Sequence, residues 1–369
     1  MGEKQEAKPN RLKHYVFWAA VGFGVVMALT SFLPLLPVNW WWVRIGDFPR
    51  LQLLIGSLIA MGMLAPFWRR RFTKSLMLLL LLGVGIQVYW ISPYLPWAPV
   101  EVEDAKSQDK STHVRILAAN VLQENDQADA LLELITEVDP DVITLCEVNQ
   151  RWIDDLSALE KDYPHFLKHP QDNTYGIAIY SRLPLIDPQV RTLVKETIPS
   201  IDTRARLPSG HEVRVFVVHP NPPRPGESTA KRDAELILVG REIEEDASAI
   251  VMGDLNDVGW SRTTNLFQEV SDLIDPRKGR GLYPTYNAKS MIWRYPLDYC
   301  FHSDDFRLVQ METLRDIGSD HFPLYVELSH EPDARDEQAA PHLDQGDQED
   351  AEQAVETAKE EGHNVEDSE

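Results

Sequence analysis

Three long uncharged apolar runs near the start of the chain constrain its fold more than any other feature. They cover residues 15–36, 51–68 and 75–93. An α-helix needs about 20 apolar residues to cross the core of a bilayer. Short polar segments separate the runs, which argues against buried helices of a soluble domain, and no small-residue cleavage site follows the first run. The sequence therefore predicts a membrane anchor in residues 1–93, with three transmembrane helices.

Basic residues flank these runs unevenly. Four precede the first run and four more lie in residues 69–74, whereas the segment between the first two runs carries Arg44 and Arg50 beside Asp47. Because positively charged segments stay on the cytoplasmic side, everything after about residue 93 is expected outside the cytoplasm. The runs contain no ionisable residue of the kind that marks a transport path, so an anchor is favoured over a transporter.

The rest of the chain is acidic. Its net charge is −22, although residues 1–99 hold ten basic residues against three acidic ones. Nothing after residue 100 forms a basic region, which argues against a nucleic-acid binder that depends on electrostatic attraction. A metal enzyme remains compatible, because a bound cation changes the local field and can attract a phosphate group.

Composition divides the chain after the anchor into three parts. Residues 94–111 change from aromatic and proline-rich to charged and are predicted to be a linker. Residues 112–330 contain the apolar runs of a folded domain. Residues 331–369 are strongly acidic with few large apolar side chains, which predicts a disordered tail.

Cysteine usage excludes two further classes of protein. With only Cys146 and Cys300, the chain has neither a disulfide framework nor a cysteine-rich zinc site. Both cysteines lie in apolar, strand-like runs. We expect two separately buried thiols, and a single disulfide bridge stays open as the alternative.

The domain of residues 112–330 has the pattern of an α/β (α+β) fold. Helical apolar spacing occurs over residues 128–138 and 228–246. Short apolar runs predict strands at residues 114–120, 141–148, 175–181, 212–220, 249–256, 296–301 and 322–328. Several strands with few helices indicate a layered sheet protein, long enough to bury a substantial core.

Polar side chains close most of these strands. Each has an ordinary structural explanation on its own, but strand ends of a sandwich converge on one rim. The set comprises Asn120, Glu147, His219, Asp254, Asn256, Asp298, Asp320 and His321. Carboxylate and amide oxygens suit Mg²⁺ or Mn²⁺ better than zinc. Two histidines can supply an acid and a base, so the set suits attack of water on a phosphoester.

The order of these motifs carries a family resemblance. Asn120, Glu147, YGIAIYSRLP, His219, GDLN, LDY and GSDH resemble the endonuclease/exonuclease/phosphatase superfamily of Mg²⁺-dependent phosphoesterases, over about residues 113–328. Residues 219–236 are most similar to its membrane-anchored bacterial branch. The resemblance implies a four-layer αββα sandwich, two packed β-sheets with helices outside, in an integral protein of a bacterial inner membrane.

The resemblance also implies a role for each residue of the metal site. Glu147 would be the principal ligand of Mg²⁺ or Mn²⁺. Asn120 would orient that ligand or a water on the metal, and Asp320 would support the metal.

The remaining residues would act on the substrate. The resemblance implies that Asp254 and Asn256 position the attacking water and the phosphate oxygens. His321 would be the general base, held by Asp298, and His219 would stabilise or protonate the phosphate. Two positions stay open. Arg182 would contact phosphate or form a salt bridge behind the site, and residues 283–296, which depart from the pattern expected of relatives, would form part of the pocket wall.

We therefore predict a membrane-anchored, divalent-metal-dependent phosphodiesterase. Its phosphodiester substrate, a nucleic acid or a lipid headgroup, is left open, and no protein partner is predicted. The alternative is a catalytically inactive, membrane-tethered binding module of the same fold.

Overall fold

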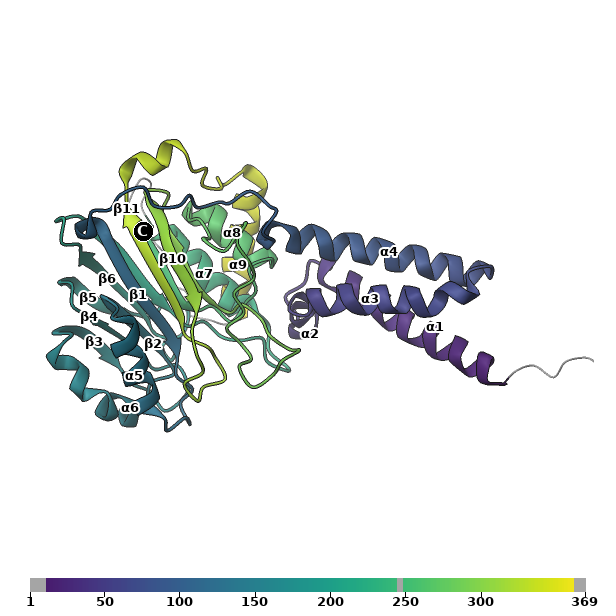
Figure 1. Ribbon diagram of the computed structural model, residues 1–369, viewed down its shortest axis with the longest axis horizontal. Coiled ribbons are helices and arrows are strands. Elements are labelled where there is room, and N and C mark those ends of the chain that lie inside the picture. Colours follow the sequence, from purple (N-terminus) through teal and green to yellow (C-terminus); the bar gives the residue numbers. More distant parts are fainter. Residues whose placement is uncertain (1–10, 244–247, 362–369) are drawn as a thin grey trace, which may run out of the picture. The chain divides into compact units, whose positions relative to one another are not determined.

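The computed structural model describes residues 11–243 and 248–361. The chain divides into two compact units, with boundaries between Val38 and Asn39, Trp41 and Trp42, and Ser92 and Pro93. We call the first the helical unit and the second, which consists of Asn39–Trp41 and everything after Ser92, the sandwich unit (Figure 1).

The helical unit contains the apolar runs. Its helices are α1 (Arg11–Phe32), α2 (Trp41–Arg44, which begins at the unit boundary), α3 (Arg50–Leu64) and α4 (Arg71–Ile91). Phe17, Leu64 and Leu80 are buried where α1, α3 and α4 pack together, whereas many large apolar side chains on their outer faces are exposed. Three segments, Arg11–Leu35, Arg50–Phe67 and Arg71–Tyr94, are long and apolar enough to cross a membrane.

Two mixed β-sheets form the centre of the sandwich unit. The six-stranded sheet has the order β10-β11-β1-β2-β4-β3, and the five-stranded sheet has the order β5-β6-β7-β8-β9. The strands are β1 (His113–Asn120), β2 (Val142–Cys146), β3 (His165–His169), β4 (Ile177–Ser181), β5 (Leu185–Arg191), β6 (Ser200–Arg206), β7 (Glu212–Val218), β8 (Ala249–Asp254), β9 (Asp298–His302), β10 (Phe306–Thr313) and β11 (Leu324–His330).

Helices cover the outer face of each sheet. Helices α5 (Ala128–Val138) and α6 (Gln150–Asp155) pack on the six-stranded sheet. Helices α7 (Ala230–Arg241), α8 (Arg262–Ser271) and α9 (Gln345–Glu360) pack on the five-stranded sheet. The predicted four-layer αββα sandwich is therefore confirmed. Of the helix predicted over residues 228–246, residues 230–241 are helical, and residues 244–246 lie outside the described residues.

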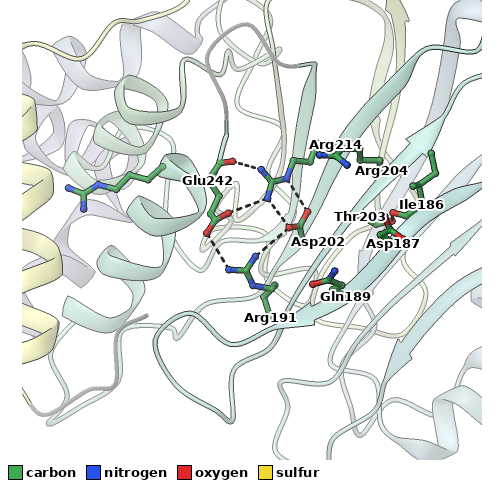
Figure 2. Close-up of a pocket in the computed structure, with 10 residues that line it drawn as sticks. Ile186, Asp187, Gln189, Arg191, Asp202, Thr203, Arg204, Arg214 and Glu242 are labelled. Carbon is green, nitrogen blue, oxygen red and sulfur yellow. Dashed lines mark hydrogen bonds and ion pairs between the residues drawn. The ribbon is translucent and has the colours of Figure 1, made fainter. Parts of the chain in front are cut away.

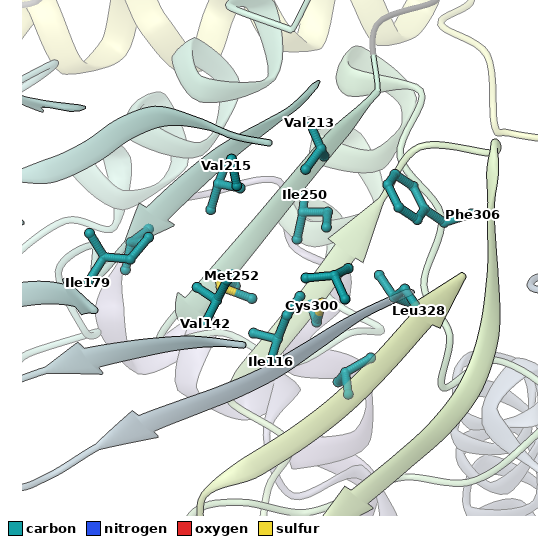
Figure 3. Close-up of a cluster of buried hydrophobic side chains, with 14 of the residues drawn as sticks. Ile116, Val142, Ile179, Val213, Val215, Ile250, Met252, Cys300, Phe306 and Leu328 are labelled. Atoms are coloured by element: carbon teal, nitrogen blue, oxygen red, sulfur yellow. The ribbon is translucent and has the colours of Figure 1, made fainter. Parts of the chain in front are cut away.

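The main core lies between the two sheets. Ile116, Val142, Val215 and Ile250 are among the buried side chains that meet there (Figure 3). Side chains alternate between the two faces of a strand, so Val215 and Val217 of β7 enter this core while Phe216 packs toward the helices. Cys146 and Cys300 are both buried and unbridged, as expected.

Four strands were not predicted from the sequence. Strands β3 and β10 are the edges of the six-stranded sheet, and β5 and β6 end the five-stranded one. Their outward faces are partly exposed and carry charged residues such as Asp187, Arg204 and Arg206. Because these residues interrupt the apolar pattern, the segments resemble loops in sequence although their backbones pair within a sheet.

The prediction of a disordered tail is wrong for residues 345–360. These residues form α9, which begins with a capping box at Asp344. Ala351, Val355 and Ala358 recur at helical spacing and are buried among side chains of α7 and α8. Small apolar residues on one face are enough to dock an otherwise acidic helix. A pattern judged by large apolar residues does not reveal such a face. Residues 362–369 of the predicted tail lie outside the described residues.

The prediction of a linker over residues 94–111 is also wrong. Val102 is buried in the core between the sheets, and Glu101 pairs with Lys278 at 2.7 Å. The backbone N–H of Ala105 donates to the carbonyl oxygen of Leu308, and the N–H of Leu308 donates to the carbonyl oxygen of Glu103. This segment therefore extends the six-stranded sheet next to β10 and belongs to the sandwich unit.

Candidate active site

The predicted site residues lie where parallel strands end. Strands β1 and β2 are parallel, as are β7 and β8, and the carboxyl ends of parallel strands lie at the same edge of a sheet. Asn120 ends β1, Glu147 directly follows β2, His219 follows β7 and Asp254 ends β8. In the GDLN motif, Gly253 has φ +130°, and a Cβ there would lie 2.1 Å from the carbonyl oxygen of Val218. Only glycine fits at that position between β7 and β8.

Asn120 joins the two sheets. Its side-chain amide donates to Glu147 Oε1 and to Asp254 Oδ2, each at 3.0 Å. Its own oxygen accepts from the backbone N–H of Leu122 at 3.0 Å. One buried amide therefore fixes the carboxylate of the six-stranded sheet relative to the carboxylate of the five-stranded sheet.

His321 and Asp298 form a buried pair. His321 Nδ1 lies 2.7 Å from Asp298 Oδ2, and its Nε2 lies 3.5 Å from Asp254 Oδ2. Burial disfavours the charged imidazole, but the carboxylates of Asp298 and Asp254 outweigh it and raise the pKa of His321 to about 10. The bond from Nδ1 to Asp298 fixes the ring orientation and leaves Nε2 directed toward the other site carboxylates.

His219 lies near the same oxygen of Asp254 as His321 does. Its Nε2 is 3.6 Å from Asp254 Oδ2, and its ring packs 5.4 Å from the ring of Tyr175. Burial lowers the pKa of His219, which favours the neutral imidazole. Its Nδ1 is buried without a hydrogen-bond partner among the described residues, a cost of about 1–3 kcal/mol that a bound polar group can relieve.

Asn256 follows Asp254 on a tight backbone turn. Its N–H donates to Asp254 Oδ1 at 2.9 Å, and its side-chain amide donates to the carbonyl oxygen of Pro220 at 2.9 Å. Arg232 of α7, which is buried, donates to the carbonyl oxygen of Asn256 at 3.2 Å. Both Asn256 and Glu147 have positive φ, +52° and +63°. Such conformations cost free energy and are concentrated at functional sites.

The site gathers several carboxylates without a lysine or arginine partner among the described residues. Within the described residues, no lysine or arginine lies within ion-pair distance of Glu147, Asp254, Asp298 or Asp320. Burial raises the pKa of Glu147 and of Asp254. Oxygen atoms of Asp254 and Asp298 and a nitrogen of His321 lie within 4.8 Å of one another, a grouping that can hold a metal ion. A divalent cation fits this donor set, because buried carboxylates need a counter-charge and oxygen ligands suit Mg²⁺ or Mn²⁺.

Of the two remaining positions, Asp320 lies in the site and Arg182 forms a salt bridge to a residue outside it. Asp320 is half-buried and influences both Glu147 and His321 electrostatically, so it lies with the other carboxylates. Arg182 instead pairs with Asp139 at 2.6 Å. The salt-bridge alternative for Arg182 is therefore the one the structure contains.

Sequence reasoning missed several residues that support the site. Ser319 Oγ donates to the carbonyl oxygen of Asn120 at 2.8 Å and accepts from the N–H of His321 at 3.0 Å. The backbone N–H of Gln123 donates to Glu147 at 3.3 Å, and the ring of Tyr286 lies 5.0 Å from that of His321. These residues are not carboxylates or histidines and do not end strands. The only sequence signal for them is their position next to the GSDH motif or close to a strand end.

A separate pocket of about 490 Å³ lies beside β5 and β6 (Figure 2). It contains none of the predicted site residues. Asp202 pairs with Arg214 at 2.8 Å, and Glu242 pairs with Arg191 at 3.2 Å. The carboxylates of Asp202 and Glu242 are therefore compensated by arginines, unlike those of the rim described above.

Comparison with known proteins agrees with this fold. The sequence profile of the Endonuclease/Exonuclease/phosphatase family matches residues 116–321, more than half of the chain. The chain belongs to this family, whose fold is that of phosphoester-cleaving hydrolases. No curated protein sequence matches the chain.

Solved structures are similar to this chain at low sequence identity. A humanised TDP2 of D. rerio is 17% identical, with a TM-score of 0.50, over 59% of this chain and 99% of that chain. The human Nocturnin catalytic domain with bound sulfate is 20% identical, with a TM-score of 0.49, over 59% and 94%. A family member from Beutenbergia cavernae is 19% identical, with a TM-score of 0.48, over 60% and 72%. At 17% identity, the likeness to TDP2 concerns the fold alone.

Proposed function

We propose that the chain is a membrane-anchored, divalent-metal-dependent phosphodiesterase. The observation that carries this proposal is the rim where both sheets end, with four carboxylates, two asparagines and two histidines and no lysine or arginine counter-charge among the described residues. Membership of a family of phosphoester-cleaving hydrolases supports it. The substrate is a phosphodiester, from a nucleic acid or a lipid headgroup.

The metal ligands in this proposal are Glu147 and Asp320, with Asn120 holding Glu147 in place. Asn120 suits this role because it donates to both Glu147 and Asp254 and keeps the two carboxylates apart. When bound, Mg²⁺ or Mn²⁺ supplies positive charge that polarises a phosphoryl oxygen and lowers the pKa of His321 toward that of a general base.

His321 is the residue that takes the proton from the attacking water. Its Nδ1 is held by Asp298, so Nε2 is the atom that accepts the proton. Asp254 lies 3.5 Å from that nitrogen and is positioned to hold the water through its carboxylate. Asn256, fixed by Arg232 and Pro220, presents a polar edge to the phosphate oxygens.

His219 acts on the phosphate in this proposal. Its lowered pKa favours a neutral ring with one N–H to donate, and its buried Nδ1 lacks a partner among the described residues. A hydrogen bond to a phosphoryl oxygen becomes stronger as negative charge develops on that oxygen in the transition state.

The helical unit is the proposed membrane anchor. Its three apolar helices have the length and composition of membrane spans. The excess of basic residues before the first apolar run and in residues 69–74 favours a cytoplasmic position for these segments in a bacterial cell and a position outside the cytoplasm for the sandwich unit. An export-dependent reporter fused at the chain's C-terminus should be active, and activity of a cytoplasm-dependent reporter at the same position would contradict the orientation.

The proposed activity is tested with the full-length protein in detergent, because residues 94–109 and α9 belong to the sandwich unit. The measurement is hydrolysis of bis-p-nitrophenyl phosphate, first with EDTA and then with Mg²⁺ or Mn²⁺ restored. We expect activity that the metal restores. Glu147→Gln should shift half-maximal activity to a higher metal concentration, and His321→Ala should remove turnover.

Absence of activity from folded protein with either metal would contradict the proposal and favour the inactive binding module. An unchanged metal titration in Glu147→Gln would remove Glu147 from the ligand set.

A further inference from the structure

We propose that residues 289–294 form a membrane-contacting loop beside the active site, which makes a phosphoester at a lipid surface the substrate. We call this segment the 289–294 loop. The inference rests on the proposed function and extends it, because it names a lipid surface as the location of the phosphoester substrate. The loop lies within residues 283–296, which the sequence analysis expected to form part of the pocket wall.

Three consecutive large apolar side chains are exposed at its tip. Met291, Ile292 and Trp293 are 92%, 68% and 53% exposed. Elsewhere in the sandwich unit, no two consecutive large apolar residues of the described ranges are exposed in this way. Exposed apolar area costs roughly 25 cal/mol per Å² relative to burial, so a contiguous group on an otherwise polar surface indicates a contact with an apolar partner.

The local structure holds these side chains outward. Ser290 Oγ accepts from the N–H of Trp293 at 3.0 Å, and the carbonyl oxygen of Ser290 accepts from Arg294 Nε at 2.6 Å. The Arg294 guanidinium also lies 4.9 Å from the centre of the Phe322 ring. The loop is therefore a built turn anchored to the segment that carries His321.

The loop is joined to the active site through two further contacts. The N–H of Ala288 donates to the carbonyl oxygen of Asp320 at 2.7 Å, directly before Lys289. The ring of Tyr286 packs 5.0 Å from that of His321. A lipid surface in contact with the loop therefore lies beside the carboxylates and histidines of the rim.

The chemistry of the loop fits a lipid surface. Lys289 and Arg294 are exposed on either side of the apolar tip and can pair with headgroup phosphates, while the tip enters the apolar boundary. Tryptophan is enriched at that interface because its ring is apolar with one polar N–H. Met291 and Ile292 have no flat ring on which a nucleic-acid base could stack, so a single-stranded nucleic acid fits less well.

The chain itself also favours this occupant. It contains three helices with the properties of membrane spans. The main segment of the sandwich unit begins at Pro93, two residues after the end of α4, so the sequence leaves no long spacer between the third apolar helix and this segment.

The first test measures whether the loop touches lipid. Full-length Met291→Cys is labelled with an environment-sensitive fluorophore and placed in nanodiscs that contain phosphatidylglycerol and doxyl-labelled lipids. Cys146 and Cys300 are buried and do not compete for the label. Lys161→Cys, at an exposed position outside the six-stranded sheet, is the matched control.

We expect doxyl lipids to quench the label at residue 291 at least twofold more than the label at residue 161. Equal quenching at the two positions would overturn the proposal. A spectral shift at residue 291 that single-stranded DNA produces and lipid does not would also overturn it and assign the loop to nucleic acid.

The second test separates this inference from the proposed function. The triple variant Met291→Ser, Ile292→Ser and Trp293→Ser is compared with the wild type on phosphatidylglycerol in nanodiscs and on soluble bis-p-nitrophenyl phosphate. We expect the ratio of the lipid rate to the soluble rate to fall about tenfold or more, consistent with lost apolar contact. An unchanged ratio would overturn the lipid-surface inference. Failure of the wild type on the soluble ester would instead contradict the proposed phosphodiesterase.

Discussion

Histidine and aspartate residues cluster at both ends of the sandwich, but the carboxylates are compensated by a basic side chain such as arginine at one end only. Strand β7 has His211 before its first residue and His219 after its last, and β11 has His321 before it and His330 at its end. At each end, histidine and aspartate side chains lie close enough together to hold a metal ion. One group is Asp254, Asp298 and His321, and the other is His211, Asp305 and His330.

At the second end, the charges satisfy one another. Asp305 accepts from Ser303 Oγ at 2.5 Å and from Arg335 at 3.2 Å, and His330 Nε2 lies 3.4 Å away. Burial opposes ionisation of Asp305, but these hydrogen bonds outweigh it and lower its pKa. The rings of His211 and His330 stack 3.6 Å apart.

At the first end, burial instead raises the pKa of Glu147 and Asp254, and no lysine or arginine of the described ranges compensates them. The comparison teaches that a His/Asp cluster is a candidate site when no lysine or arginine compensates its carboxylates, and a structural network when one does. We call the two ends the catalytic rim and the structural rim, and the predictions below separate them.

The largest expected difference is in turnover. His321→Ala should lower kcat on bis-p-nitrophenyl phosphate by about 10²–10⁴-fold, because it removes the acid–base group. His330→Ala at the structural rim is the matched change and should lower kcat less than about threefold once the protein is folded, since His330 does not touch the substrate in this account. Steady-state kinetics on the two variants, with circular dichroism to verify folding, makes the comparison. Equal losses would erase the distinction between the rims.

Metal binding should stabilise the catalytic rim only. At 100 times its Kd, a ligand of the folded state adds about 2.7 kcal/mol of stability, equivalent to roughly 5–10 °C in the unfolding midpoint of a domain of this size. We expect Mn²⁺ to raise the midpoint of the wild type and of Asp305→Asn by a similar amount. Glu147→Gln should show a much smaller rise. A thermal scan in which Glu147→Gln keeps the full rise would argue against the ligand assignment.

The structural rim should carry stability that depends on pH. Asp305→Asn should cost about 1–3 kcal/mol at pH 7, because it weakens hydrogen bonds to a buried charge. The folded pKa of Asp305 is lowered, so its stabilisation is complete above the unfolded pKa of about 3.9 and is lost as pH falls below it.

The check is the midpoint difference between the wild type and Asp305→Asn at pH 7 and at pH 3.5. The difference should shrink at the lower pH. Glu147→Gln in metal-free buffer should change the midpoint less than Asp305→Asn does, and a larger effect of Glu147→Gln would reverse the assignment of the two rims.

An effect on stability of similar size, without a change in turnover, is expected at the docked C-terminal helix, which lies at neither rim. Ala351→Asp places a carboxylate against buried side chains of α7 and α8 and should cost about 1–3 kcal/mol. Gln353→Asp adds the same charge at an exposed position of α9 and should cost much less. Thermal unfolding compares the two. Equal midpoints for both variants would show that α9 contributes little to the stability of the sandwich unit.

The seven strands predicted from the sequence are those with continuous apolar runs, and they carry all eight predicted site residues or lead directly to them. Asn120, Glu147 and Asp254 could be predicted to meet because each ends a strand whose pattern is clear. Strands such as β6 were missed because their alternating charged residues leave no such run.

The supporting contacts could not be predicted, because each ends on a backbone carbonyl oxygen, which no pattern of side chains in the sequence marks. Ser319 bonds to the carbonyl oxygen of Asn120 across 199 positions, and Arg232 holds the carbonyl oxygen of Asn256. The structural rim went unnoticed for a related reason. Asp305 follows a turn after β9, and its partners come from four separate segments.

The most direct test of the central claim is anomalous diffraction from crystals of the protein soaked in Mn²⁺. We expect a manganese peak at the catalytic rim, beside the side chains of Glu147 and Asp320, and none beside Asp305 and His330. A peak only at the structural rim, or no peak at either rim at saturating Mn²⁺, would contradict it.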